Sequence, residues 1–189
     1  MQASPNPFRL VTTVHALRTL YFVRAVFSLI WVSLLLVFVK SSPAATSFLL
    51  LLYPTWDVAA TFFDIRANRG ASSKLPQYVN IVIGLLATVA VSVALKQNVP
   101  TVLLVFGAWA IITGLIQLTL GLRRRRTLGG QWPMILSGGQ SVIAGASFIA
   151  MAQSPNIGIL NLAGYSAFGA FYFLLAAFRL GKNGQATQQ

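Results

Sequence analysis

The sequence predicts an all-α membrane protein in which six transmembrane helices form three parallel helical-hairpin repeats. Charged residues are only 8% of the 189 residues, against roughly 25% in an ordinary soluble domain. Six apolar runs are each long enough to cross a hydrocarbon layer of about 30 Å as a helix, and these runs recur at a regular spacing. The composition excludes a soluble globular enzyme, because so few charges cannot cover a surface in water, and it excludes disorder over most of the length.

The predicted spans follow one another with short connections, so we expect one transmembrane domain over residues 20–180. Unbroken runs of this length favour helices, since the strands of a membrane barrel would alternate over segments of about ten residues. In chain order the spans are Leu20–Val39, Ala44–Ile65, Tyr78–Leu95, Thr101–Leu122, Trp132–Ala152 and Gly158–Phe178.

Matching residues recur in the three pairs of spans. Pro43, Pro100 and Pro155 lie in the three turns and are 57 and 55 residues apart. The even-numbered spans end next to Arg66, Arg123 and Arg179, which are 57 and 56 residues apart. An internal period of this kind indicates repeated supersecondary units. We therefore predict hairpin repeats over about 20–66, 78–123 and 132–179, arranged in parallel about an axis near the membrane normal.

The two ends of the chain are predicted to be tails. Residues 1–19 form an N-terminal tail, in which Phe8–Leu17 is a candidate for a short interfacial helix, and residues 181–189 form a polar, flexible tail. A cleaved signal peptide ending near Ser41–Ala45 is the alternative for the first span. We favour a retained anchor, because the run has 20 residues and Arg24 interrupts its start.

The Lys and Arg residues set the expected orientation. Eleven of the 14 fall on the side of the tails, the second connection and the fourth connection, two fall on the other side at Lys40 and Lys96, and Arg24 lies within the first span. Cytoplasmic loops carry the excess of positive charge. We therefore expect both termini in the cytoplasm and the protein in the bacterial inner membrane.

Several segments resemble one family. They are Phe106–Leu118 with the arginines that follow it, Gly130–Trp132, Gly138–Pro155, and Arg24 ahead of an apolar run that ends at Pro43. These segments are similar to the HdeD-like acid-resistance membrane proteins, which consist of short hairpin repeats of unassigned function. The resemblance covers about residues 15–180. It implies an inner-membrane location and a link to acid or envelope stress, and it implies no catalytic residue.

Both acidic residues of the chain lie in the second predicted span, and ionisable residues there are candidates for function. Asp57 and Asp64 are seven residues apart, which puts them on one helix face together with Tyr53 and Thr61. Arg24 is the expected partner of Asp57, because the two lie at depths that an arginine side chain can bridge. This candidate polar site is either a structural ion pair that locks the first hairpin, which we favour, or a protonatable site. Asp64 is expected at the interface near Arg66, with little functional meaning.

Other polar residues within the spans are expected to form hydrogen bonds between helices, a solute path being the alternative. They are Asn80, Gln117, Gln140 and Asn161. Small residues recur at helical spacing and predict close packing of helices, within the protomer or between protomers. They are Asn80, Gly84, Thr88 and Ser92 on the third span, Gly107, Gly114 and Gly121 on the fourth, and Ser137, Ser141 and Gly145 on the fifth.

The run Arg123, Arg124, Arg125 and Arg126 is a candidate for contact with anionic lipid headgroups, with topology alone as the alternative. We expect the lipid bilayer and a homo-oligomer as partners, no nucleic acid, no metal and no cofactor. Cys is absent and His15 is the only histidine, so most acid–base schemes lack parts. The predicted function is a non-enzymatic role in membrane or acid-stress resistance. A small proton-linked transporter or channel that uses Asp57 is the alternative.

Overall fold

The computed structural model describes residues 7–67, 74–128 and 131–186 and consists there of six helices. They are α1 (Pro7–Phe38), α2 (Pro43–Ala67), α3 (Leu75–Ala94), α4 (Val99–Leu128), α5 (Trp132–Ala150) and α6 (Ile159–Ala186). All six are long and apolar enough to cross a membrane. The predicted all-α membrane fold is confirmed, and the helices follow the predicted order.

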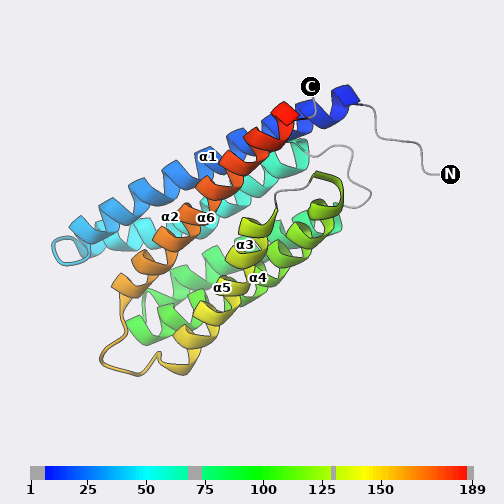
Figure 1. The fold of residues 1–189 in the computed structure, drawn as a ribbon. Coiled ribbons are helices and arrows are strands. Elements are labelled where there is room, and N and C mark those ends of the chain that lie inside the picture. Colours follow the sequence, from blue (N-terminus) through cyan, green and yellow to red (C-terminus); the bar gives the residue numbers. More distant parts are fainter. Residues whose placement is uncertain (1–6, 68–73, 129–130, 187–189) are drawn as a thin grey trace.

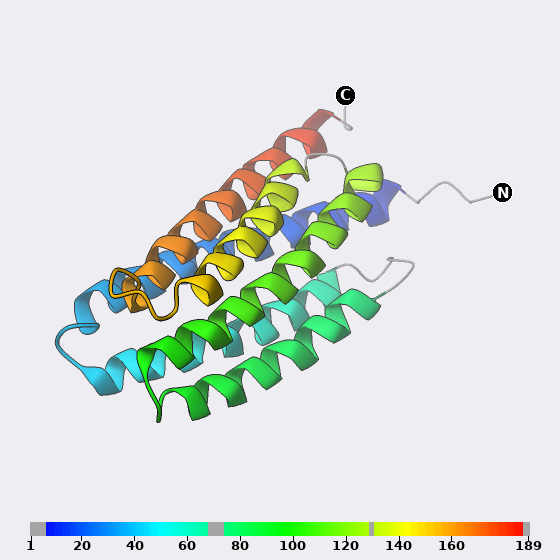
Figure 2. The ribbon, with the colours of Figure 1, turned by 90° about the horizontal axis from the view of Figure 1, so that it is seen from below.

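The helices run side by side, and both ends of the chain lie at the same end of the bundle (Figure 1). The turns after α1, α3 and α5 lie at the opposite end, as a second view shows (Figure 2). Each helix packs on the next one in the chain, and α6 packs back on α1, so the bundle is a closed ring. The closest packing is between α4 and α5 and between α1 and α6, which belong to different hairpins.

Three helices extend six or more residues beyond their predicted ends. α1 begins at Pro7 and has no break before the first span, so a separate interfacial helix over 8–17 is wrong. α4 continues through the four arginines to Leu128, and α6 continues to Ala186 into the predicted tail. A helix elongates cooperatively once formed, and no proline follows Phe178 to stop α6.

Glycines explain the close approach of α4 and α5. A Cβ atom built on Gly107 would lie 2.7 Å from the carbonyl oxygen of Gly145, and one built on Gly114 would lie 2.8 Å from that of Gly138. The predicted packing stripes of these two helices therefore face each other within the protomer. Small residues let backbones approach where lipid supplies no hydrophobic force between helices.

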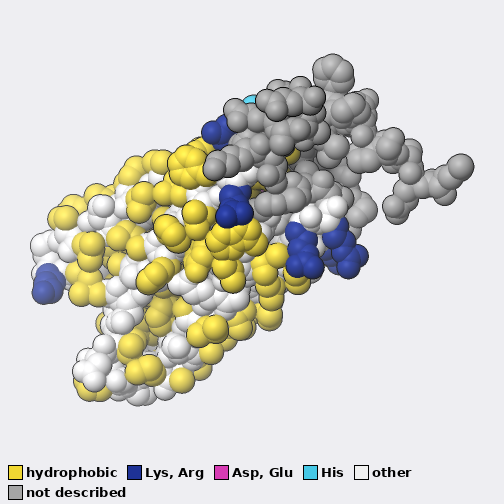
Figure 3. Space-filling model, in the orientation of Figure 1, with side chains coloured by type: hydrophobic (Ala, Val, Ile, Leu, Met, Phe, Trp, Pro, Cys, Tyr) yellow, Lys and Arg dark blue, Asp and Glu magenta, His cyan; other side chains and the backbone are white. Residues whose placement is uncertain are grey.

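The outer surface suits lipid rather than water. Large hydrophobic side chains are exposed on all six helices, for example Val26, Phe48, Val82, Leu115 and Ile143. On the face seen in Figure 3, hydrophobic side chains cover the middle, and the Lys and Arg side chains lie towards the ends. A soluble monomer rarely exposes apolar area on this scale.

Candidate functional site

A polar cavity lies inside the ring and is lined by residues from all six helices. Its volume is about 120 Å³, which is room for roughly ten water molecules. Arg24, Asp57, Asp64 and Arg124 line it together with uncharged polar and aromatic side chains. Both carboxylates of the protein and two of its arginines therefore share one internal space.

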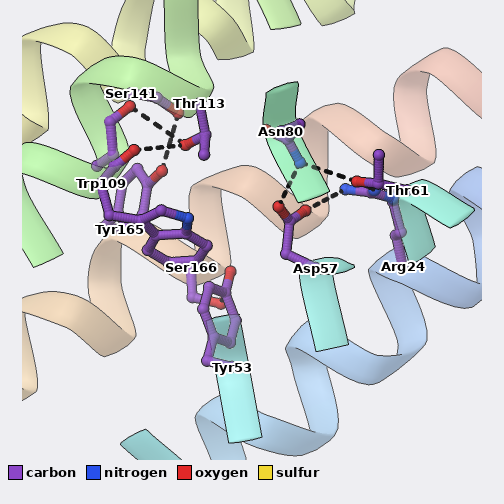
Figure 4. Close-up of polar contacts among 11 residues, drawn as sticks. Arg24, Tyr53, Asp57, Thr61, Asn80, Trp109, Thr113, Ser141, Tyr165 and Ser166 are labelled. Atoms are coloured by element: carbon purple, nitrogen blue, oxygen red, sulfur yellow. Dashed lines mark hydrogen bonds and ion pairs between the residues drawn. The ribbon is translucent and has the colours of Figure 1, made fainter. Parts of the chain in front are cut away.

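The first ion pair joins α1 to α2. Arg24 Nη1 lies 2.8 Å from Asp57 Oδ1, and Arg24 Nη2 donates to the Thr61 hydroxyl at 3.2 Å. The Asn80 amide from α3 donates to Asp57 Oδ2 at 2.8 Å and to Thr61 at 2.9 Å, so both carboxylate oxygens are engaged (Figure 4). The Arg24 guanidinium also lies over the ring of Phe173 on α6, 5.4 Å from its centre. Charge-assisted bonds of this kind are among the stronger ones in proteins.

The pairing of Arg24 with Asp57 agrees with the prediction, and so does the place of Thr61 beside them. Asn80 forms the bond between helices that was expected of it, and Gln117 donates to the Met134 carbonyl oxygen on α5 at 3.4 Å. Asn161 does not act in this way. It is exposed, and its side-chain oxygen accepts from the backbone N–H of Gly158 at 2.8 Å, at the start of α6.

The second ion pair joins α2 to α4 and was not predicted. Arg124 Nη2 lies 2.8 Å and 2.7 Å from the two carboxylate oxygens of Asp64, and Arg124 Nη1 donates to the Tyr21 hydroxyl at 3.3 Å. The Gln77 amide on α3 is 3.5 Å from Asp64 Oδ2. Both charged side chains are only 9% exposed. This ion pair is more deeply buried than that of Arg24 and Asp57, whose side chains are 16% and 18% exposed.

Two predictions about these residues are therefore wrong. Asp64 was expected at the membrane interface near Arg66, without a functional role. It lies inside the ring instead, where it binds Arg124. Arg124 is not a headgroup contact, because α4 remains helical through the arginines and consecutive residues point about 100° apart. Only Arg124 faces the cavity, while Arg123, Arg125 and Arg126 are exposed.

Tyr53 lies apart from the Asp57 group. Its hydroxyl accepts from Ser166 Oγ on α6 at 2.8 Å, and its ring packs against those of Trp31 and Trp109. Tyr165 similarly donates to Ser141 Oγ on α5 at 2.9 Å. Figure 4 shows these hydroxyl contacts as a group separate from that of Arg24 and Asp57. Tyr53 thus links α2 to α6 through Ser166.

The cavity does not continue through the other half of the ring. An apolar cluster fills the part nearer the three turns, and it includes Trp31, Leu50, Val91, Leu103 and Leu162. These five side chains are 1% exposed or less. A proton or solute that passed Asp57 would meet this cluster, so the geometry does not favour the transporter alternative.

Sequence reasoning missed four of the polar side chains that line the cavity: Tyr21, Gln77, Trp109 and Gln131. Gln77 and Gln131 each stand one residue before a predicted span, and the closed ring buries both of them. Among the residues that the structure describes, no group of three or more His, Cys, Asp or Glu side chains is arranged to hold a metal.

Residues 78–150, from α3 to the end of α5, are similar to a family described as a short repeat of unknown function, DUF308. No curated protein and no solved structure matches the chain. The family match agrees with a multi-pass membrane protein that contains this short repeat.

Proposed function

We propose that this chain is a non-enzymatic, multi-pass protein of the bacterial inner membrane that supports resistance to acid or other envelope stress. The resemblance to HdeD-like proteins suggests this role, and the DUF308 match over residues 78–150 is compatible with it. The observation that carries the proposal is that both carboxylates of the chain are held inside the ring by arginines of other helices.

These two ion pairs offer a physical link to acid. Protonation of Asp57 or Asp64 removes the counter-charge of a guanidinium that the ring encloses, and an uncompensated charge inside a protein is costly. Asp57 accepts from Arg24 on α1 and from Asn80 on α3, and Asp64 accepts from Arg124 on α4 and from Gln77 on α3. Because both carboxylates already bind arginines, neither is free to act as a catalytic acid or base, which supports a non-enzymatic role.

We expect Asp57→Asn to abolish any protection against acid. A strain that lacks the protein should survive acid challenge less well than its parent, and the wild-type chain should restore survival whereas Asp57→Asn should not. Survival is counted as colonies after challenge, with membrane levels of each variant checked by immunoblot. Thr119→Val is the matched control, because this exposed hydroxyl bonds only its own helix at the Leu115 carbonyl. Equal survival of the deleted and parent strains would contradict the role.

We further propose that both termini are cytoplasmic and that anionic lipid headgroups contact the exposed Arg123, Arg125 and Arg126. The support is the excess of Lys and Arg at the end of the bundle that holds the termini. Any homo-oligomer would use other faces than the glycines of α4 and α5, because those pack within one protomer.

Reporter fusions test this orientation. A fusion after Lys96, in the turn between α3 and α4, should report from the periplasm, and a fusion after Arg125 should report from the cytoplasm. The measurement is the activity of paired reporters that function on only one side of the membrane. The reverse pattern would refute the orientation without affecting the fold.

A further inference from the structure

Four side chains that line the cavity carry buried polar atoms with no hydrogen-bond partner among the described residues. They are the indole N–H groups of Trp56 and Trp109, the side-chain oxygen of Gln77, and both amide atoms of Gln131. Gln77 and Gln131 are each 1% exposed. Buried polar atoms are almost always hydrogen-bonded in native proteins, so such a group within one cavity calls for an explanation.

The charges and the volume of the cavity limit what can satisfy these atoms. The two arginines are balanced by the two carboxylates they bind, so the cavity offers no net charge to an ion. The unpartnered atoms are uncharged and include both donors and acceptors. About 120 Å³, the room of roughly ten water molecules, accommodates only a small molecule of up to about ten non-hydrogen atoms.

We propose that the cavity is a binding site for a small uncharged solute that both donates and accepts hydrogen bonds, of the polyol or carboxamide class. Gln131 both donates to it and accepts from it at the start of α5. Gln77 accepts from the side of the Asp64 ion pair. The inference goes beyond the stress role and does not depend on it, because it rests on the unpartnered atoms and not on protonation.

Saturation-transfer NMR on the full chain in lipid nanodiscs tests the site, since this method detects weak ligands. The probes are glycerol and acetamide, with acetate and methylammonium as charged probes. We expect transfer from the protein to both neutral probes, well above that from empty nanodiscs, and much less to the charged probes. The variant Gln131→Leu should lose the transfer.

The matched control is Gln140→Leu, which makes the same chemical change at a residue that does not line the cavity. It should keep the wild-type signal. The cavity variant should fold at least as well as wild type without probe, because apolar groups of similar size replace polar groups that lack protein partners. Should it fail to fold, Gln131→Met supplies the test. No transfer above empty nanodiscs, equal signals from the Gln131 and Gln140 variants, or stronger transfer to a charged probe would each overturn the proposal.

Discussion

Asp64→Asn is expected to lower the free energy of unfolding by about 3–5 kcal/mol, the usual cost of removing one partner from a buried ion pair. Arg124 would keep its charge, its buried place against α2 and its bond to the Tyr21 hydroxyl, but it would lose the carboxylate that balances its charge. The change in stability can be measured by unfolding the protein in bicelles with a denaturing detergent.

Arg124 and its neighbour in the sequence provide the control. Arg124→Leu should destabilise by a similar amount, because it leaves the Asp64 carboxylate buried and unpaired. Arg125→Leu should change stability by less than about 0.5 kcal/mol, since Arg125 is exposed. The double variant Asp64→Leu with Arg124→Leu should regain most of the loss, because apolar residues can replace a buried ion pair at little cost. Equal effects of the Arg124 and Arg125 variants would refute the internal ion pair.

The difference in burial also predicts an order of effects. Asp57→Asn should cost less than Asp64→Asn, because the side chains of the Arg24–Asp57 pair are about twice as exposed as those of the Arg124–Asp64 pair. The Arg24 guanidinium also keeps Thr61 and the ring of Phe173 after the carboxylate is lost.

The sequence was sufficient to predict the number of helices and one ion pair. The helices were predictable because each span needs about 20 apolar residues to cross the lipid. This requirement concerns the whole run and does not depend on any single residue. The Arg24–Asp57 pair was predictable because its members belong to adjacent spans of one hairpin, so their depths could be compared directly.

The Arg124–Asp64 pair was not predictable in the same way. The two residues are 60 positions apart and belong to helices that are not neighbours in the chain. Their meeting depends on α4 remaining helical through four arginines and on α6 closing the ring against α1. The distribution of charge indicated that the four arginines lie on the cytoplasmic side. It gave no information about which of their side chains would point into the ring.

The two adjacent glycines of α5 are expected to respond to alanine with opposite signs. Gly138→Ala should destabilise the protein by about 1–3 kcal/mol, the range for overpacking a tight core. Its Cβ would lie 2.7 Å from the Gly114 carbonyl oxygen and 2.7 Å from the Leu118 backbone nitrogen. Both are backbone atoms, so relief requires α4 and α5 to separate.

Gly139→Ala is the matched control, because the built Cβ of this residue meets nothing within 4 Å. It should stabilise the protein by about 0.5–1 kcal/mol, since alanine is the better helix former. Unfolding in bicelles measures both variants under one condition. Helix propensity alone would make both substitutions stabilising, and general damage to the helix would make both destabilising. Close packing of the α4 and α5 backbones predicts that Gly138→Ala destabilises the protein whereas Gly139→Ala stabilises it. Stability changes of the same sign for both variants would refute this packing, on which the closed ring and its cavity depend.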